Sequence, residues 1–249
     1  DLIQYGNRRF HQAAEVVHCL RMLLEKTTEW GLTLVIVSLD IRKAFDTIIP
    51  DAIEQLLYEC NVPPRLIFAI LQEILDDRKF IPLIFGMKGG EAEMHAGLRQ
   101  GSPEAALLFS AVISRVLNRL VASWKSRGFG VHLGSFEGDI NCFKEWVHKS
   151  KEHLVNIDIQ NLHVASLAFV DDIYLIAKST SEATVMLAEV RLELDKIGLK
   201  LQEAKLKWVA NKYVEEEVIV SGSLEIPRSE SLTVLGSIVR GDLDEVEAH

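Results

Sequence analysis

The chain has 249 residues, of which 48% are hydrophobic, so it can bury a substantial core and is neither disordered nor fibrous. Its net charge of -9, from 27 basic and 36 acidic residues, weighs against a free-standing nucleic-acid binder because phosphate contacts need cations. The three cysteines are widely separated and lack the spacing of a zinc site or a disulfide framework, which indicates a reducing, intracellular compartment.

The first half of the chain predicts helices that alternate with short strands. Apolar residues recur at helical spacing from Gln12 to Trp30, and Gly31 follows as a stop. Thr33 to Leu39 is rich in β-branched residues, which is typical of a buried strand, and Asp40 stands at its exit. Two more helices are predicted over Asp51 to Tyr58 and Pro64 to Leu75, the second with proline in its first turn.

The middle of the chain predicts a hairpin and a long helix. Phe80 to Phe85 and Ala92 to His95 flank Gly89-Gly90, a turn signal. An apolar helix follows from about Glu104 to Trp124, whereas Gly134 to Gln160 is mixed and polar and predicts a loop or irregular insertion. Apolar runs such as Leu34 to Leu39 are far shorter than the roughly 20 residues of a membrane span, so we expect no membrane association.

The last part of the chain predicts a tight hairpin with acids at its tip. His163 to Phe169 and Ile173 to Ala177 are apolar runs, and only Val170-Asp171-Asp172 separates them. The remaining predicted elements are a helix over Ser181 to Ile197 and strands over Leu206 to Ala210, Val218 to Val220 and Leu232 to Val239. This order predicts an α+β fold in which helices cover one face of a largely antiparallel sheet.

Three carboxylates are placed to share one edge of that sheet. Asp40 closes one apolar strand, and Asp171 and Asp172 cap a hairpin between two others. Like charges so close would resist ionisation without cations between them, and hard oxygen ligands suit Mg²⁺. Two ions about 3.5 to 4 Å apart would clamp the attacking and leaving oxygens of a phosphoryl transfer. The alternative for a single Asp at a strand end is a turn or helix cap, but strongly apolar flanks favour a metal site because unpaired buried charge is costly.

Six segments in the right order resemble the motifs of reverse transcriptases, especially those of LINE-type, non-LTR retrotransposons, and they span nearly the whole chain. The segments are Gln4-Tyr5-Gly6-Asn7-Arg8 in the fingers, Ser38-Leu39-Asp40-Ile41-Arg42-Lys43-Ala44-Phe45-Asp46, Gly97-Leu98-Arg99-Gln100-Gly101-Ser102-Pro103, Phe169-Val170-Asp171-Asp172, Gly198-Leu199-Lys200-Leu201 with Lys205, and Leu235-Gly236 in a primer-grip hairpin. The resemblance implies a right-hand polymerase palm with part of the fingers, and an RNA-dependent DNA polymerase that transfers dNTPs to a primer 3′-OH by a two-metal mechanism.

The resemblance also implies metal ligands and a general acid. Asp40, Asp171 and, less directly, Asp172 would hold two Mg²⁺ ions, or Mn²⁺, with help from the carbonyl of Ile41. Lys205 would approach the leaving pyrophosphate as a donor or general acid.

Further residues would bind the incoming nucleotide. Phe45 would stack under its sugar and exclude a 2′-hydroxyl, although an aromatic beside a strand is as often simple core. Gln100 and Gly101 would lie against the nascent base pair, or else are turn residues. Arg8 would bind the triphosphate, or else is a solvated surface cation.

The same resemblance places the domains and partners. Partial fingers would occupy about 1–30 and 55–100, the palm about 31–54 and 101–240, and the thumb would lie beyond residue 249, so we expect a piece of a longer polypeptide. RNA template, DNA primer and dNTPs are the expected partners, and the expected place of action is intracellular and nuclear.

Some positions depart from the family pattern. Ala105 and Ala106, after Glu104, stand where a second Ser-Pro pair is usual, which would alter the helix start. Other departures are Asn7 for an aromatic, Gln202 for Asn and Leu206 for Thr. A group II intron maturase or retron enzyme and a degenerate, non-catalytic palm scaffold stay open as alternatives, while Phe45 argues against an RNA-dependent RNA polymerase.

Overall fold

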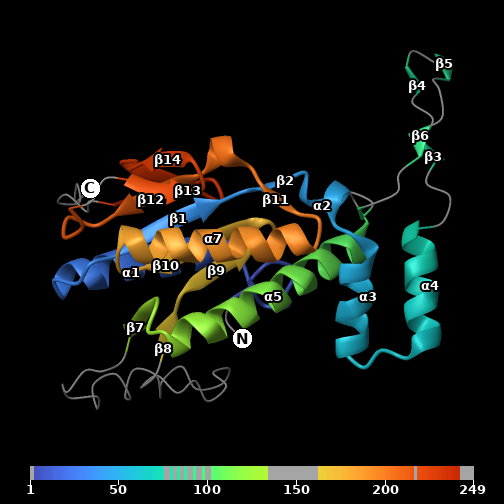
Figure 1. The fold of residues 1–249 in the computed structure, drawn as a ribbon, viewed down its shortest axis with the longest axis horizontal. Coiled ribbons are helices and arrows are strands. Elements are labelled where there is room, and N and C mark those ends of the chain that lie inside the picture. The colour runs from blue at the N-terminus through green and yellow to red at the C-terminus, as the bar shows by residue number, and fades with distance from the viewer. Residues whose placement is uncertain are drawn as a thin grey trace.

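A four-stranded antiparallel sheet forms the centre of the chain (Figure 1). The computed structural model describes residues 3–75, 79–80, 83–84, 87–88, 92–93, 97–98, 102–133, 162–215 and 218–241. The strand order is β12-β1-β10-β9, with bounds Lys207–Ala210 for β12, Val35–Leu39 for β1, Asp172–Ala177 for β10 and Ser166–Phe169 for β9. The predicted α+β fold class is confirmed.

Both faces of this sheet are buried. Val35, Val37 and Leu39 of β1 belong to one core cluster, whereas Leu34 and Ile36 belong to the other. Successive side chains of a strand point to opposite faces, so a strand covered on both sides is apolar at every position. This explains why β1 and β10 appear in the sequence as continuous apolar runs.

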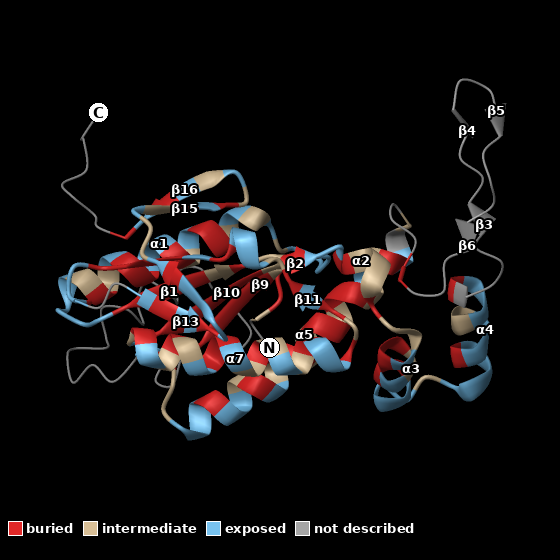
Figure 2. Ribbon diagram, turned by 45° about the horizontal axis from the view of Figure 1, so that its top comes forward, coloured by how far each residue is buried: buried red, intermediate tan, exposed pale blue. Residues whose placement is uncertain are grey.

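Helices α5 (Pro103–Ser126) and α7 (Thr180–Lys196) cover the first face and lie side by side across it (Figure 1). The second face, for which no helix was expected, is covered by α1 (Ala13–Glu29) and by a hairpin of β15 (Ser231–Val234) and β16 (Ser237–Arg240). Figure 2 shows that the buried residues gather on the strands and on the helix sides that face them. The sheet is therefore the middle of three layers.

The helix boundaries follow local sequence signals. Gln12 and Glu15 form a capping box at the start of α1, and Gly31 has a positive φ of 69° just beyond its end. At the start of α5 the hydroxyl of Ser102 accepts a hydrogen bond from the N–H of Ala105 at 3.3 Å, and Pro103 takes the first helical position. The first Ser-Pro pair thus caps the helix in this chain, and the effect of Ala105 and Ala106 relative to the family pattern stays a prediction.

Helices α3 (Pro50–Glu59) and α4 (Pro64–Leu75) form a helical hairpin at the N-terminal end of α5 (Figure 1). After them β3 (Lys79–Phe80) pairs with β6 (Ala92–Glu93), and β4 (Leu83–Ile84) pairs with β5 (Met87–Lys88). The two arms of the predicted hairpin are therefore paired, and Gly89-Gly90, the predicted turn, lies outside the described residues.

Several short elements escaped the sequence patterns because two to four residues show no periodicity. They are β2 (Ile41–Arg42) and its partner β11 (Lys200–Leu201), α2 (Ala44–Thr47), the 3-10 turn η2 (Glu203–Lys205), β7 (Val131–Leu133) and β14 (Leu224–Pro227). β7 pairs with β8 (Leu162–Val164), which overlaps the start of the predicted run from His163, and β14 pairs with β13 (Val218–Ser221), which matches the predicted strand Val218 to Val220. The predicted irregular segment Gly134 to Gln160 lies outside the described residues.

One helix in the described part of the chain, Glu104–Ser126, is long and apolar enough to cross a membrane by length and composition alone. The helix itself was predicted, but our expectation of no membrane association considered only uninterrupted apolar runs and left its length and hydropathy out. Its apolar side, with Phe109, Val112, Val116 and Trp124, is packed into the core of the fold. These contacts explain the hydropathy of α5 as that of a central core helix.

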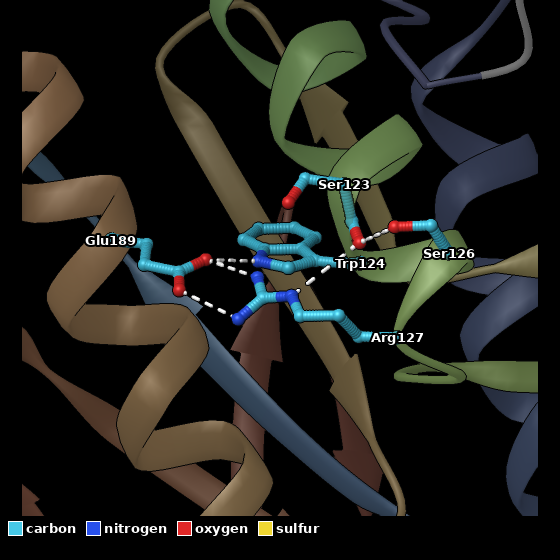
Figure 3. A network of polar contacts seen from close by, with 5 residues as sticks. All are labelled: Ser123, Trp124, Ser126, Arg127 and Glu189. Carbon is cyan, nitrogen blue, oxygen red and sulfur yellow. Dashed lines mark hydrogen bonds and ion pairs between the residues drawn. The ribbon is translucent and has the colours of Figure 1, made fainter.

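A polar network joins α5 to α7 at the end of the sheet (Figure 3). Trp124 is fully buried, and its indole N–H donates to Glu189 Oε2 at 2.7 Å. Arg127 donates to both oxygens of the same carboxylate, at 2.9 and 2.6 Å, and this hydrogen bonding lowers the pKa of Glu189. The bidentate pair lets a carboxylate approach a core tryptophan because its charge is compensated.

We expect Trp124→Ala to lower the free energy of unfolding by about 3–5 kcal/mol, because it leaves a cavity between α5 and α7 and removes a donor to Glu189. Urea unfolding followed by circular dichroism measures the change. Leu192→Ala on the exposed side of α7 is the control and should change stability by less than about 0.5 kcal/mol. Equal losses of unfolding free energy in the two variants would contradict the close packing of Trp124 between α5 and α7.

Candidate active site

The main cavity, of about 920 Å³, opens where β1 ends and where the β9–β10 turn, the start of α5 and the β11–η2 segment meet it. It collects residues from four of the sequence motifs that are far apart in the chain. Its lining includes Asp40, Ile41, Phe45, Ser102, Asp171 and Lys205.

The register of β1 and β10 decides which carboxylates meet. Leu39 pairs with Ile173, so Asp40 and Asp172 are the next residues outward on the two antiparallel strands. Phe169 pairs with Asp172, which leaves Val170 and Asp171 as a two-residue turn. Asp40 and Asp171 line the cavity, whereas Asp172 is absent from its lining and lies at the base of the turn.

The carboxylates perturb one another. Burial, and then the charges of Asp171 and Asp40, raise the pKa of Asp172 to about 6. Burial also raises the pKa of Asp171, Asp40 adds to this rise, and Lys205 opposes it. Since Asp171 and Asp172 resist ionisation here, a cation placed beside them would stabilise their charged forms.

Lys205 reaches the carboxylates through a short strand pair. Leu201 of β11 pairs with Ile41 of β2, and the N–H of Gln202 donates to the carbonyl of Asp40 at 2.8 Å. The next turn, η2, brings the Lys205 ammonium within 2.8 Å of Asp40 Oδ2. This hydrogen bond raises the pKa of Lys205, whose side chain is otherwise exposed and therefore able to move.

Phe45 forms one wall of the cavity. Its ring lies 4.9 Å from that of Phe109 on α5, so the ring is half-buried and fixed from behind. The carbonyl of Phe45 accepts the N–H of Leu98 at 2.5 Å. A Cβ at Gly97 would lie 2.6 Å from that same carbonyl oxygen, and its φ is 93°, so glycine is required here. The start of the motif Gly97-Leu98-Arg99-Gln100-Gly101-Ser102-Pro103 is thereby held beside Phe45.

Gln100 and Gly101, predicted to contact the nascent base pair, lie outside the described residues. Their described neighbours are Leu98, which is fixed on Phe45, and Ser102, which lines the cavity. Arg42 and Lys43 also line the main cavity. No role was predicted for these two cations, although they directly follow Asp40 and Ile41 in the sequence.

Arg8 is not brought to the carboxylates. It lines a second cavity, of about 580 Å³, with residues of α3 and α5, and its guanidinium donates to the carbonyl of Gln4 at 3.3 Å. The chain turns away after Gly6, because Asn7 has a positive φ of 57° and its amide donates to Ala106 and Ser110 on α5. Arg8 and the carboxylates therefore line different cavities in this structure, and the binding of a triphosphate by Arg8 stays a prediction.

The donor set of the main cavity fits a hard divalent cation. Carboxylate oxygens of Asp40 and Asp171 face one space, and Ile41 lies at the same wall. Among the described residues no three acidic, histidine or cysteine side chains form a ready-made metal cluster. The ammonium of Lys205, rather than a third carboxylate, is the partner of Asp40.

We expect the free energy of unfolding of the metal-free chain to fall as the pH rises from about 4 to about 6. The pKa of Asp172 is raised from 3.8 to about 6 in the folded chain, so the folded state binds more protons than the unfolded state in this window. Asp172→Asn removes the effect: the variant should match the parent near pH 4 and be more stable above pH 6, by on the order of 1 kcal/mol for a half-exposed group.

Urea unfolding in chelator at several pH values measures this difference. Asp195→Asn, at an exposed position of α7, is the matched control and should shift stability equally at every pH. A constant difference between the Asp172→Asn variant and the parent would contradict the raised pKa.

Comparisons with known proteins show to which family the chain belongs. No curated protein matches the sequence. Similar solved structures include apo telomerase from Candida tropicalis truncated from its C-terminal domain, at 11% identity and a TM-score of 0.50, covering 95% of this chain and 40% of that one. Another is telomerase from Candida tropicalis in complex with the TWJ fragment of telomeric RNA, at 11% identity and a TM-score of 0.53, covering 95% and 34%.

The chain spans less than half the length of these telomerase structures, and at such low identity the likeness concerns the fold. The sequence match is more specific, because residues 3–239 fit the model of the family described as reverse transcriptase (RNA-dependent DNA polymerase). The chain belongs to the reverse transcriptase family.

Proposed function

We propose that this chain is the catalytic core of an RNA-directed DNA polymerase from a LINE-type retrotransposon, which extends a DNA primer on an RNA template. The observation that carries the proposal is the meeting of Asp40, Asp171, Phe45 and Lys205 around one cavity in a member of the reverse transcriptase family. These four residues come from three different sequence motifs, and the fold alone brings them together.

Asp40 and Asp171 would hold two Mg²⁺ ions, or Mn²⁺, with Asp172 and the carbonyl of Ile41 in support. When bound, such ions polarise the primer hydroxyl and neutralise charge on the transferred phosphate. The carboxylates contribute fixed negative charge at a partly desolvated site, where cation binding is stronger than in water. Asp172 is set back from the cavity, which suits a supporting role.

Lys205 would serve the leaving group. In the structure its ammonium is paired with Asp40, and its side chain is 61% exposed, so it has room to leave this carboxylate for a pyrophosphate. A lysine ammonium is protonated at neutral pH even without its bond to Asp40, as a donor to a departing anion must be. Arg42 and Lys43 line the same cavity and would attract the triphosphate.

Phe45 would select deoxynucleotides. Its ring is held from behind by Phe109 and forms a cavity wall, so it cannot retreat from a 2′-hydroxyl placed against it. We assign the fingers to about 1–30 and 55–100 and the palm to about 31–54 and 101–240. For an element that copies itself at chromosomal targets, the nucleus is the place of action.

The competing proposal is a non-catalytic palm that acts as a scaffold, favoured by the net charge of -9. A group II intron maturase or a retron enzyme would share the same catalytic core. Loss of one metal-binding carboxylate separates the catalytic proposals from the scaffold, because only a polymerase depends on it for nucleotide incorporation.

We expect the protein to extend a DNA primer annealed to RNA with dNTPs and Mg²⁺, and Asp171→Asn or Asp40→Asn to lower the rate by roughly 10³-fold or more. Primer extension resolved on gels measures the rate, and a Mg²⁺-dependent rise in melting temperature reports ion binding independently. Asp195→Asn is the control that makes the same chemical change at an exposed site. Equal extension by the Asp171→Asn variant and the control would refute the site, and no extension by the parent would favour the scaffold.

We expect Phe45→Val to raise ribonucleotide incorporation relative to deoxynucleotide incorporation by roughly tenfold or more, because a smaller side chain leaves room for a 2′-hydroxyl. The ratio of kcat/KM for the two nucleotides measures the change. Phe68→Val, at a position of α4 that is 69% exposed, should leave the ratio unchanged. An unchanged ratio in the Phe45→Val variant would mean that Phe45 is only a core residue.

A further inference from the structure

The turn that carries Asp171 contains a strained residue. Val170 has a φ of +58°, a region that β-branched residues almost never occupy. The two-residue connection between Phe169 and Asp172 demands it, because tight hairpins need a positive φ in the turn. Such strain costs about 1–3 kcal/mol and persists only where neighbouring groups enforce it.

One side chain, that of Gln4, binds both polar groups of Val170. The N–H of Val170 donates to Gln4 Oε1 at 2.9 Å, and Gln4 Nε2 donates to the carbonyl of Val170 at 3.1 Å. Gln4 is only 3% exposed, so these hydrogen bonds compete little with water. A primary amide matches the donor and acceptor of a single residue, and it thereby fixes that residue's orientation.

Gly6 makes this contact possible and fixes the orientation of the amide. The N–H of Gly6 donates to Gln4 Oε1 at 2.8 Å, so this atom accepts two N–H groups and must be the oxygen. A Cβ at Gly6 would lie 2.5 Å from the nitrogen of Val170 and 2.6 Å from its Cγ2. No larger residue fits there unless the Asp171 turn moves.

The main chain around Gln4 is attached to the strand that enters the turn. The N–H of Ala168 on β9 donates to the carbonyl of Ile3 at 2.7 Å, and the N–H of Tyr5 donates to the carbonyl of Ala168 at 2.8 Å. Residues 3–5 thus run parallel to β9 as an additional edge segment. Beyond Gly6, the side-chain amide of Asn7 donates hydrogen bonds to Ala106 and Ser110 of α5.

We propose that Gln4 is a positioning residue of the active site, which holds Val170 in its left-handed conformation and so keeps Asp171 directed into the cavity. Gln4 does not line that cavity, so it acts through the turn and not on substrate. The assignment rests on the proposed function for the role of Asp171. It gives Gln4 and Gly6 a task at the Asp171 turn, in addition to their place beside Arg8 in the lining of the second cavity.

The test compares Gln4→Met with the parent. Met has a similar size but offers neither the donor nor the acceptor. We expect the dissociation constant for Mn²⁺, measured by electron paramagnetic resonance titration, to rise about 10–100-fold, as when a residue behind a metal ligand is removed. The kcat of primer extension should fall in parallel, with little change in the KM for dNTPs. Gln55→Met, the same change at an exposed site of α3, should leave both quantities unaltered.

Val170→Gly in the Gln4→Met background provides the decisive rescue. Glycine adopts a positive φ without strain, so the turn no longer needs the amide, and Mn²⁺ affinity should recover to within a few-fold of that of the single Val170→Gly variant. Absence of rescue in a folded double variant would overturn the proposal, because Gln4 would then act by some route other than the strain at Val170.

Gln4→Glu keeps the test usable if Gln4→Met does not fold. A carboxylate still accepts the N–H groups of Val170 and Gly6 but cannot donate to the Val170 carbonyl, so a smaller loss of Mn²⁺ affinity is expected. Normal Mn²⁺ affinity in this variant would also overturn the proposal. Since Mn²⁺ binding is read without polymerisation, an inactive parent would refute the proposed function alone, whereas an active parent with equally active Gln4 variants would refute only the positioning role.

Discussion

The antiparallel pairing of β1 with β10 is the constraint on which the rest of the site depends. Its register, Leu39 opposite Ile173, makes Asp40 and Asp172 neighbours although 131 residues separate them in sequence. A shift by one residue would turn every apolar side chain of these strands to the wrong face. Because α5 and α7 cover one face and α1 the other, both sets of side chains resist such a shift. The packing of the core therefore fixes the geometry of the carboxylates.

Carboxylates held together this way are electrostatically unfavourable, and a neighbouring ammonium compensates part of their charge. Burial and mutual repulsion raise the pKa of Asp171 and of Asp172, while the ammonium of Lys205 compensates the charge of Asp40. Lys205 reaches that position only because β11 pairs with β2, directly after Asp40. The same strand pair thus holds the carboxylate of Asp40 and the ammonium of Lys205 together.

The turn that carries Asp171 also has a conformational cost, in addition to the electrostatic one. A two-residue turn that presents Asp171 at its tip forces Val170 into a left-handed conformation, and the buried amide of Gln4 satisfies both of its backbone polar groups. Gly6 leaves room for this contact, and Ser102 and Gly97 serve similar local purposes at the start of α5 and beside Phe45. Small or capping residues in the motifs therefore have identifiable mechanical reasons, apart from any contact with substrate.

The sequence by itself determined the main helices and strands, the α+β class and the tight hairpin at Val170-Asp171-Asp172, because periodicity, caps and turn residues act over a few neighbours. It also selected Asp40, Phe45, Asp171 and Lys205, which the fold does bring to one cavity. Only the tertiary structure decided the second covered face, the setback of Asp172, the placement of Arg8 in another cavity and the contact of Gln4 with Val170. These features depend on strand register and on contacts across more than a hundred residues, and no local pattern encodes such distances.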